Sequence, residues 1–180
     1  LQKYDIRIKT YLMFKPPFMS EADALNHGVK WIEDVAQRSD EISVNPMNIQ
    51  RGTIIDRLHR NNEYRPPWLW SLVEMIRRVH PTIHPNGGKN GDEDQVCRLI
   101  IHPTAGGRVR GAHNCGSCDS VVVAAIERYA VSGELEEFEG LTCSCEQAWK
   151  EEVLLEQALP VPLGISKHRR GNLLNRLRSP

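Results

Sequence analysis

The sequence lacks net charge and any long apolar run. Its 23 basic residues balance 23 acidic ones, and 26% of its residues are charged against 40% that are hydrophobic. This composition is typical of a folded globular protein. No apolar run approaches the roughly 20 residues of a membrane-spanning helix, so we expect a cytoplasmic protein with no membrane partner. Because the chain as a whole offers no attractive field, contact with nucleic acid must come from local patches.

The familiar catalytic motifs are also missing. The sequence contains no Walker loop, HExxH pattern or nucleophile–base pair, and its seven histidines are scattered. No catalytic residue is therefore assigned. The first residue is Leu1 rather than an initiator methionine. Either the sequence has been trimmed at its start or the chain is the later part of a longer polypeptide, and the organisation of its strands and helices favours the second.

Five cysteines are present, and four of them form two close pairs. Cys115 and Cys118 are spaced as CxxC, and Cys143 and Cys145 as CxC. Two such pairs are typical of a tetrahedral four-sulfur metal site, and His113 is close enough in sequence to replace one sulfur. We therefore predict a structural zinc ion at this site. Four thiolates also suit an iron–sulfur cluster, and free thiols are a further alternative.

Two other interpretations of the cysteines are disfavoured. A redox CxxC needs no second pair of cysteines. A disulfide framework is disfavoured because there is no signal peptide and because 180 residues can bury a core without cross-links. Cys97 lies in an apolar run and is interpreted as a small core residue.

Strand and helix patterns alternate along the chain. Near the start, Lys9, Tyr11, Met13 and Lys15 alternate with aliphatic residues, as expected of a strand with one buried face. The patterns predict strands at 5–14, 41–47 and 96–102, helices at 20–38, 52–59, 67–79, 119–131 and 146–159, and a loop at 81–94. Ser20 and Asp119 are the expected caps of two of the helices. Strands separated by helices imply parallel pairing.

Polar segments follow the three predicted strands. They are Lys15, the stretch 45–51 and the stretch 102–110. In a parallel barrel, functional residues lie at these carboxyl ends of the strands. The amides and guanidinium of such segments can hold a ligand, although asparagine and glycine are also ordinary turn formers.

These segments resemble a known enzyme family. Arg51-Gly52-Thr53, followed by Leu58 and Tyr64-Arg65-Pro66, resembles radical S-adenosylmethionine enzymes related to the Elongator catalytic subunit. A fuller set resembles one archaeal branch, the radical subunit of archaeosine synthase. That set comprises the segments 14–18, 45–53, 64–71 and 106–115. The resemblance covers roughly residues 5 to 150.

The resemblance implies a partial (βα)6 barrel, S-adenosylmethionine and a 4Fe-4S cluster. It also implies a tRNA substrate whose lysine-bearing deazaguanine is converted to archaeosine, and a partner subunit that attaches the lysine. The chain departs from the family in lacking the cluster motif CxxxCxxC, since Gly111 stands four residues before Cys115. We therefore expect the chain to be the α/β C-terminal half of a radical SAM-type barrel, with a C-terminal helical extension held in place by zinc. We expect this half to be inactive alone. The alternative is a zinc-containing RNA-binding or partner-docking module without catalytic activity.

The predicted regions and sites follow from this interpretation. Distal barrel units occupy 1–112, helices with the metal site occupy 113–159, and a basic tail occupies 160–180. The tail has no acidic residue and is either an RNA contact or simply solvated. Candidate contacts to S-adenosylmethionine or to a flipped-out base are Lys15, Asn45, Asn48 and Arg51. Candidate RNA contacts are Arg108, Arg110, Arg169 and Arg170.

Overall fold

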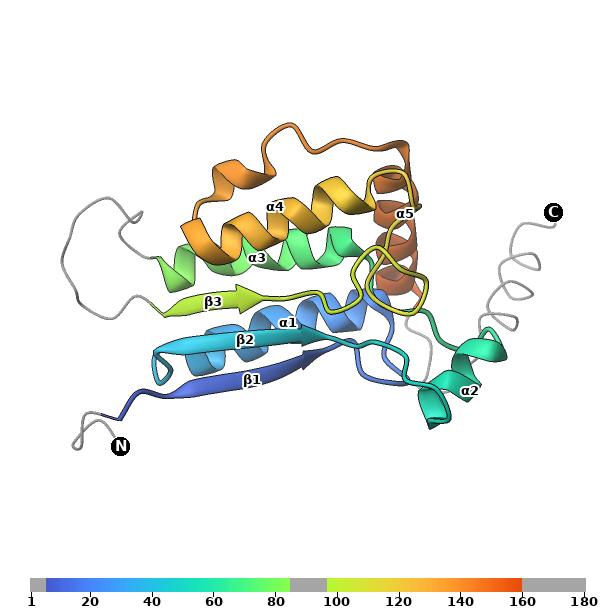
Figure 1. Cartoon of the computed structure of the whole chain (residues 1–180), viewed down its shortest axis with the longest axis horizontal. Coiled ribbons are helices and arrows are strands. Elements are labelled where there is room, and N and C mark those ends of the chain that lie inside the picture. The colour runs from blue at the N-terminus through green and yellow to red at the C-terminus, as the bar shows by residue number, and fades with distance from the viewer. Residues whose placement is uncertain (1–5, 85–96, 160–180) are drawn as a thin grey trace.

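A computed structural model describes residues 6–84 and 97–159 of the chain. Within these ranges three strands form a parallel sheet in the order β1-β2-β3 (Figure 1). The strands are β1 (Lys9–Phe14), β2 (Glu41–Pro46) and β3 (Arg98–Ile101). In the register of the sheet, Ser43 lies between Tyr11 and Ile100. The parallel pairing predicted from the sequence is confirmed.

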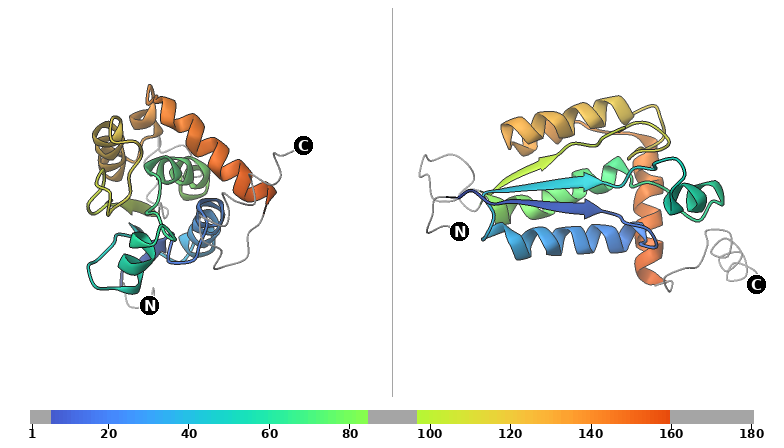
Figure 2. Two further views of the ribbon diagram at one scale, coloured as in Figure 1. Left: turned by 90° about the vertical axis from the view of Figure 1, so that its right-hand side faces the viewer. Right: turned by 60° about the horizontal axis from the view of Figure 1, so that its bottom comes forward.

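Helices separate and follow the strands. The first part of the chain contributes α1 (Glu21–Ala36), α2 (Ile54–Arg60) and α3 (Leu69–Ile83). After β3 come α4 (Asp119–Ser132), the 3-10 helix η2 (Leu135–Phe138) and α5 (Ser144–Ala158). Figure 2 shows α1, α3 and α4 stacked behind one face of the sheet, with α2 standing beyond its end. In residues 6–84 and 97–159, none of the helices is both long enough and apolar enough to cross a bilayer.

The hydrophobic core lies between the sheet and these helices. Phe14, Ile42 and Ile101 of the strands are almost completely buried, as are Leu72 and Ile76 of α3. One continuous cluster of buried residues extends from β1 to α5. The predicted regions 1–112 and 113–159 thus share one core in the described residues.

Gly28 permits a close approach between α1, α3 and β1. A Cβ atom at this position would lie 2.9 Å from Met75 Sδ and 3.0 Å from Phe14 Cε2. Such separations are shorter than van der Waals contact. A larger residue at position 28 would therefore require the Met75 and Phe14 side chains to shift.

No helix covers the opposite face of the sheet in the described structure, and β1 is its exposed part, whereas Ser43 and Ile100, which are paired in register with Tyr11, are buried. Tyr11 and Met13 of β1 are 67% and 51% exposed on this face. The predicted alternation is confirmed for Lys9, Tyr11 and Met13, but the assignment of Lys15 to the same face is wrong. Lys15 follows the strand with φ +56°, which breaks the period of two, and its side chain is buried.

Several predicted helix ends required correction. Ser20 does cap α1, because its Oγ accepts a hydrogen bond from Asp23 N at 3.0 Å. Asp119, however, is the first residue of α4 rather than its cap. α3 continues through Pro81 to Ile83, although a loop was expected there. Burial of Val79 and Ile83 in the core stabilises this last turn despite the missing proline N–H.

Candidate metal centre and polar edge of the sheet

The two cysteine pairs meet in the folded chain. The Sγ atoms of Cys115 and Cys118 are 3.9 Å apart, those of Cys115 and Cys143 are 3.7 Å apart, and those of Cys118 and Cys145 are 3.6 Å apart. All four sulfurs lie within 4.8 Å of one another. A zinc ion with Zn–S bonds of about 2.3 Å requires tetrahedral edges of about 3.8 Å. The four cysteines could therefore bind a metal ion such as zinc.

The starts of two helices position these thiols. Cys118 immediately precedes α4, while Cys143 precedes α5 and Cys145 lies in its first turn. Gly116 adopts φ +93°, which lets the chain turn between Cys115 and Cys118. Because a helix start presents free N–H groups and a partial positive charge, it favours the thiolate form that binds metal.

Polar side chains around the site hold the sulfurs in place. Trp70 Nε1 donates a hydrogen bond to Cys145 Sγ at 3.2 Å, and Asn114 Nδ2 donates one to Cys118 Sγ at 3.3 Å. The buried Asp119 Oδ1 accepts from the backbone N–H groups of Asn114 and Gly116, both at 3.1 Å. Hydrogen bonds of this kind orient metal ligands and fix the turn that carries them.

The thiols differ in their tendency to ionise. The backbone N–H groups of Cys118 and Ser117 lower the pKa of Cys115 to about 6. Burial raises the pKa values of Cys118 and Cys145 above the ordinary thiol value. Cys115, the exposed member of the set, is thus the thiol that most readily supplies a thiolate to an incoming cation.

His113 lies outside the four-sulfur group. Its Nδ1 is 2.8 Å from the carbonyl oxygen of Gly111, and burial lowers its pKa. Its own carbonyl accepts a hydrogen bond from Arg65 Nη2 at 2.8 Å. The guanidinium of Arg65 also lies 3.9 Å from the centre of the Trp68 ring. Arg65 therefore connects the segment that precedes Cys115 to the start of α3.

The predicted cofactor residues lie at the carboxyl edge of the sheet but differ in environment. Asn45 is exposed and donates to Ser43 O at 3.3 Å. Asn48 accepts from Gln50 Nε2 at 2.6 Å, and Arg51 is exposed. A hydrogen bond from Met47 N to Phe14 O, 3.0 Å long, joins this loop to the end of β1.

Lys15, the fourth predicted cofactor residue, forms a buried ion pair with Glu21. Glu21 Oε1 also accepts from Trp68 N at 2.9 Å and from Ser71 Oγ at 2.5 Å. Tyr64 donates its hydroxyl proton to the carbonyl of Lys15 at 2.7 Å. Sequence reasoning missed Glu21 because nothing in the local pattern distinguishes it from an ordinary first-turn carboxylate.

The two predicted RNA contacts in the described structure also differ. Arg110 binds Asp56 Oδ1 through Nη2 at 2.7 Å and Ile49 O through Nε at 3.1 Å. Asp56 was not identified from the sequence. Its pKa is lowered by the N–H of Gly52 and by Arg110. Arg108 is exposed and has no ion pair within the described ranges. Arg169, Arg170 and the basic tail 160–180 lie outside the described residues.

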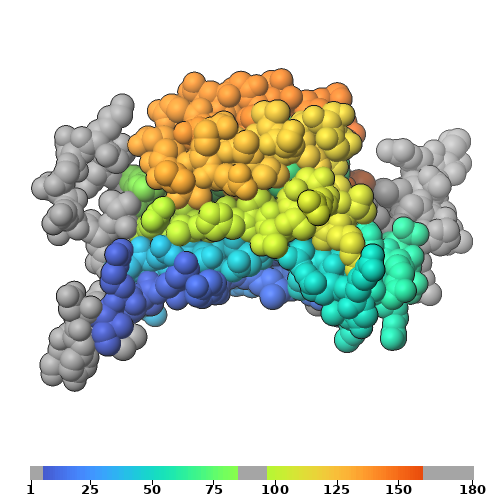
Figure 3. Space-filling view, in the orientation of Figure 1, coloured from blue at the N-terminus to red at the C-terminus, as the bar shows by residue number. Residues whose placement is uncertain are grey.

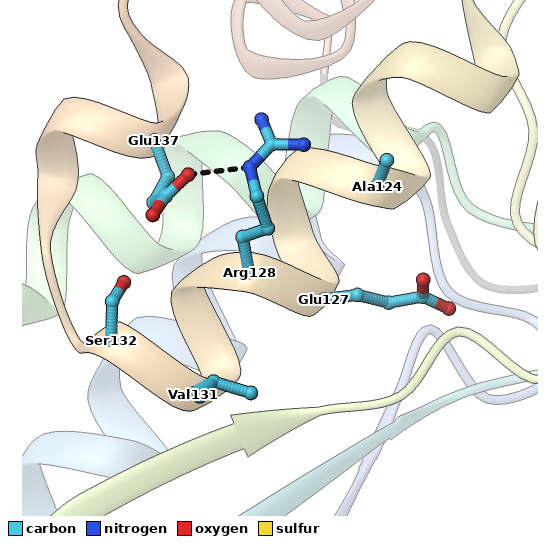
Figure 4. A pocket seen from close by; sticks show the side chains of 6 residues that line it. All are labelled: Ala124, Glu127, Arg128, Val131, Ser132 and Glu137. Carbon is cyan, nitrogen blue, oxygen red and sulfur yellow. Dashed lines mark hydrogen bonds and ion pairs between the residues drawn. The ribbon is translucent and has the colours of Figure 1, made fainter.

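Two shallow pockets lie on the helical side of the molecule. One, of about 450 Å³, lies beside α4 and η2, where Arg128 Nε contacts Glu137 Oε2 at 2.6 Å (Figure 4). It contains none of the predicted site residues. A second, of about 240 Å³, is lined in part by Trp70, Cys118 and Cys143. This second pocket borders the four-cysteine group.

Comparison with known proteins gave three archaeal relatives. The chain is 34% identical over 155 residues to "Archaeosine synthase subunit beta" of Methanosarcina acetivorans, a match that covers 86% of the chain and 42% of the relative. The protein of the same name from Thermococcus kodakarensis is 34% identical over 161 residues, covering 87% and 45%. An uncharacterized protein of Methanocaldococcus jannaschii is 30% identical over 170 residues, covering 91% and 42%. The chain thus spans less than half the length of each of these relatives. No protein-family model and no solved structure matches it.

Proposed function

We propose that the chain is part of a beta subunit of archaeosine synthase and acts in the tRNA modification that produces archaeosine. The similarity to two archaeal proteins of that name, extending over 86% and 87% of the chain, carries this proposal. The strand-end segments that resemble this family in the sequence agree with it. We also propose that the chain acts in the cytoplasm.

The finer proposal is that the chain forms the second half of a radical S-adenosylmethionine barrel. Three features support it. The strands are parallel, the helices cover one face of the sheet, and polar loops gather at the carboxyl edge. In a barrel the open face of the sheet would be the lumen, which the remainder of a longer polypeptide would complete. The relatives, which are more than twice as long as the matched region, have room for that remainder.

The cysteines of this chain fit a single ion better than a 4Fe-4S cluster. Their short Sγ–Sγ separations match the edges of a tetrahedron around one zinc ion, whereas a cubane spreads its four thiolates around a larger body. We therefore propose structural zinc here, and a cluster bound by a CxxxCxxC segment outside the chain. When bound there, the cluster and S-adenosylmethionine would supply the radical chemistry.

The loop after β2 is the proposed contribution of this chain to the active site. Asn45, Asn48 and Arg51 offer amides and a guanidinium that can orient S-adenosylmethionine or the lysine-bearing deazaguanine of tRNA. Lys15 would have to leave its ion pair with Glu21 to make such a contact. We propose that Lys15 instead positions the loop through Tyr64. The proposed partners are tRNA and the subunit that attaches the lysine.

A second candidate function is a zinc-containing RNA-binding or partner-docking module without chemistry. The four-cysteine group, which could bind a metal ion, is the observation that favours it. The two functions differ in whether the chain completes a catalytic site.

The test is to compare the chain alone with the same chain joined to the polypeptide that naturally precedes it. Both are supplied with iron, sulfide, reductant, S-adenosylmethionine and lysine-bearing tRNA, and 5′-deoxyadenosine and archaeosine are measured by mass spectrometry. We expect both products from the longer protein and neither from the chain alone. A longer protein that binds tRNA but forms neither product would support the module instead.

A further inference from the structure

Five arginines gather where the loop after β2 and helix α2 meet the loop after β3. Residues 47–63 and 102–118 contain five basic residues but only two acidic ones, Asp56 and Glu63. The basic residues are Arg51, Arg57, Arg60, Arg108 and Arg110, which we call the arginine surface. The remaining described residues contain 17 acidic and 11 basic side chains. Positive charge is therefore concentrated at this end of a molecule that is otherwise acidic.

Asp56 is the centre that holds the arginine surface together. Its buried carboxylate contacts Arg110 Nη2 at 2.7 Å and Arg60 Nη2 at 2.9 Å. It also accepts a hydrogen bond from Gly52 N at 2.9 Å, next to Arg51. The backbones of Ile49 and Arg110 are joined by a further hydrogen bond of 2.7 Å. One carboxylate thus holds a cationic side chain of its own helix, α2, beside one from the distant loop after β3.

Most of the guanidinium groups on this surface remain available to an external anion. Arg51, Arg57 and Arg108 are exposed and make no ion pair or side-chain hydrogen bond within residues 6–84 and 97–159. The side chains of Arg60 and Arg110 keep 67% and 37% of their exposure despite contacting Asp56. In Figure 3 the teal atoms of α2 adjoin the yellow-green atoms of the loop after β3, and the two segments form one continuous surface.

We propose that the arginine surface binds the phosphate backbone of tRNA beside the carboxyl edge of the sheet. The planar guanidinium matches phosphate geometry and keeps its charge at all physiological pH values. The surface adjoins the loop that carries Asn45 and Asn48, so a bound backbone would run next to the place where a base must be flipped out. The prediction from the sequence did not include α2, which now contributes to the arginine surface. Arg110, which was predicted as an RNA contact, mainly positions this surface through its ion pair with Asp56. The inference rests on the proposed function, because that function supplies the RNA.

The test reverses two exposed charges that have no ion pair among residues 6–84 and 97–159. Arg57→Glu and Arg108→Glu are combined in the whole subunit, and tRNA affinity is measured by fluorescence anisotropy between 50 and 200 mM salt. Each phosphate contact makes the slope of log affinity against log salt more negative by about 0.7–0.9. We expect the slope of the variant to be less negative by about 1.5, and its affinity at 0.1 M salt to fall roughly tenfold or more.

A matched control reverses two exposed cations elsewhere. Lys30 lies on α1 and Arg38 follows it, and neither has an ion pair within the described ranges. The combined Lys30→Glu and Arg38→Glu variant carries the same change in net charge and should keep its tRNA affinity within about twofold. Equal losses in the two variants would overturn the inference, because the effect would then come from net charge alone. Far-UV circular dichroism checks that both variants are folded.

The outcomes separate this inference from the proposed function. If the parent subunit forms archaeosine but Arg57→Glu/Arg108→Glu binds tRNA normally, the arginine surface is not the RNA site and the function stands. If reversal weakens tRNA binding while the parent forms no archaeosine, the surface is confirmed and the function fails. Loss of partner-subunit binding with unchanged tRNA affinity would also contradict the inference.

Discussion

At the residue scale, Glu21 has the largest structural role that the sequence does not reveal. Its side chain is fully buried, and it pairs with Lys15, whose side chain is only 6% exposed. Trp149 Nε1 donates to Ser71 Oγ at 2.8 Å, and Ser71 in turn donates to Glu21. The carboxylate therefore links the end of β1 to the start of α3 and, through Ser71, to α5.

Replacing Glu21 with glutamine should destabilise the chain by about 3 kcal/mol, because it leaves the ammonium of Lys15 buried without an opposite charge. Glu74→Gln is the matched control, since Glu74 forms a partly exposed pair with Arg78. That control should cost less than about 0.5 kcal/mol. Urea unfolding followed by circular dichroism measures both values. Equal costs would show that Glu21 does not neutralise a buried charge.

Sequence reasoning found the residues whose partners are close in the chain. The Ser20 cap acts on Asp23, and each cysteine pair is defined by a spacing of two or three. Glu21 and Asp56 escaped notice because their decisive partners are distant in sequence. Ser71 is 50 residues from Glu21, and Arg110 is 54 residues from Asp56. Only the fold reveals contacts of that kind.

At the scale of secondary structure, α5 depends on attachments at several points. Only Trp149 and Val153 are buried along its length, so hydrophobic packing alone holds it weakly. Glu156 accepts a hydrogen bond from Ala22 N at 3.0 Å, and Glu152 accepts one from Trp68 Nε1 at 3.2 Å. Figure 2 shows α5 crossing the ends of α1 and α3. The glutamates lie at the positive starts of those helices, where carboxylates are stabilising.

Removing the metal should therefore loosen α5 before it affects the sheet. We expect about one zinc ion per chain by elemental analysis, and little or none in Cys115→Ser. Cys97→Ser is the control, because Cys97 lies in the core away from the four-sulfur group and should leave zinc content unchanged. In the metal-free protein, amide hydrogen exchange in 144–158 should accelerate at least tenfold while β2 stays protected. Unchanged exchange in α5 would show that the metal does not fasten this helix.

Helices and strands were predictable where a local pattern dominates, and less so where tertiary packing overrides it. The alternation in β1 and the apolar stripe of α1 both correspond to elements of the structure. The end of α3 did not follow its local signal, because packing of Ile83 outweighs the proline two residues before it. The 3-10 helix η2 was not predicted, and its Phe138 packs on Tyr129 with ring centres 5.4 Å apart.

At the scale of the whole molecule, the sheet is covered by helices on one side only. Tyr11 and Met13 project from the other side as neighbouring exposed side chains, and contiguous exposed apolar patches mark interaction surfaces. Under the proposed function, that partner is the remainder of the same barrel. This exposure could not be predicted from the sequence, because period-two alternation does not say what covers the second face.

The double variant Tyr11→Asp/Met13→Asp tests this arrangement. In the chain alone it should change the melting temperature little, since both side chains are already in water. In the longer polypeptide it should cost at least about 2 kcal/mol, the usual value for a buried side chain of this size. Val131→Asp on α4, where Val131 is 81% exposed, is the control and should be harmless in both forms. Equal melting temperatures for the parent and the double variant in the longer polypeptide would rule out a covered face.

The tight contact at Gly28 has a consequence for protein engineering. Glycine inside a helix costs roughly 1 kcal/mol relative to alanine, and glycine-to-alanine exchange is a routine way to stabilise helical proteins. In α1 that gain depends on Met75 Sδ and the Phe14 ring, because these side-chain atoms occupy the space that a methyl group would need and must shift to admit it. Gly28→Ala therefore belongs in the same redesign as its two neighbours rather than in a routine set of single exchanges.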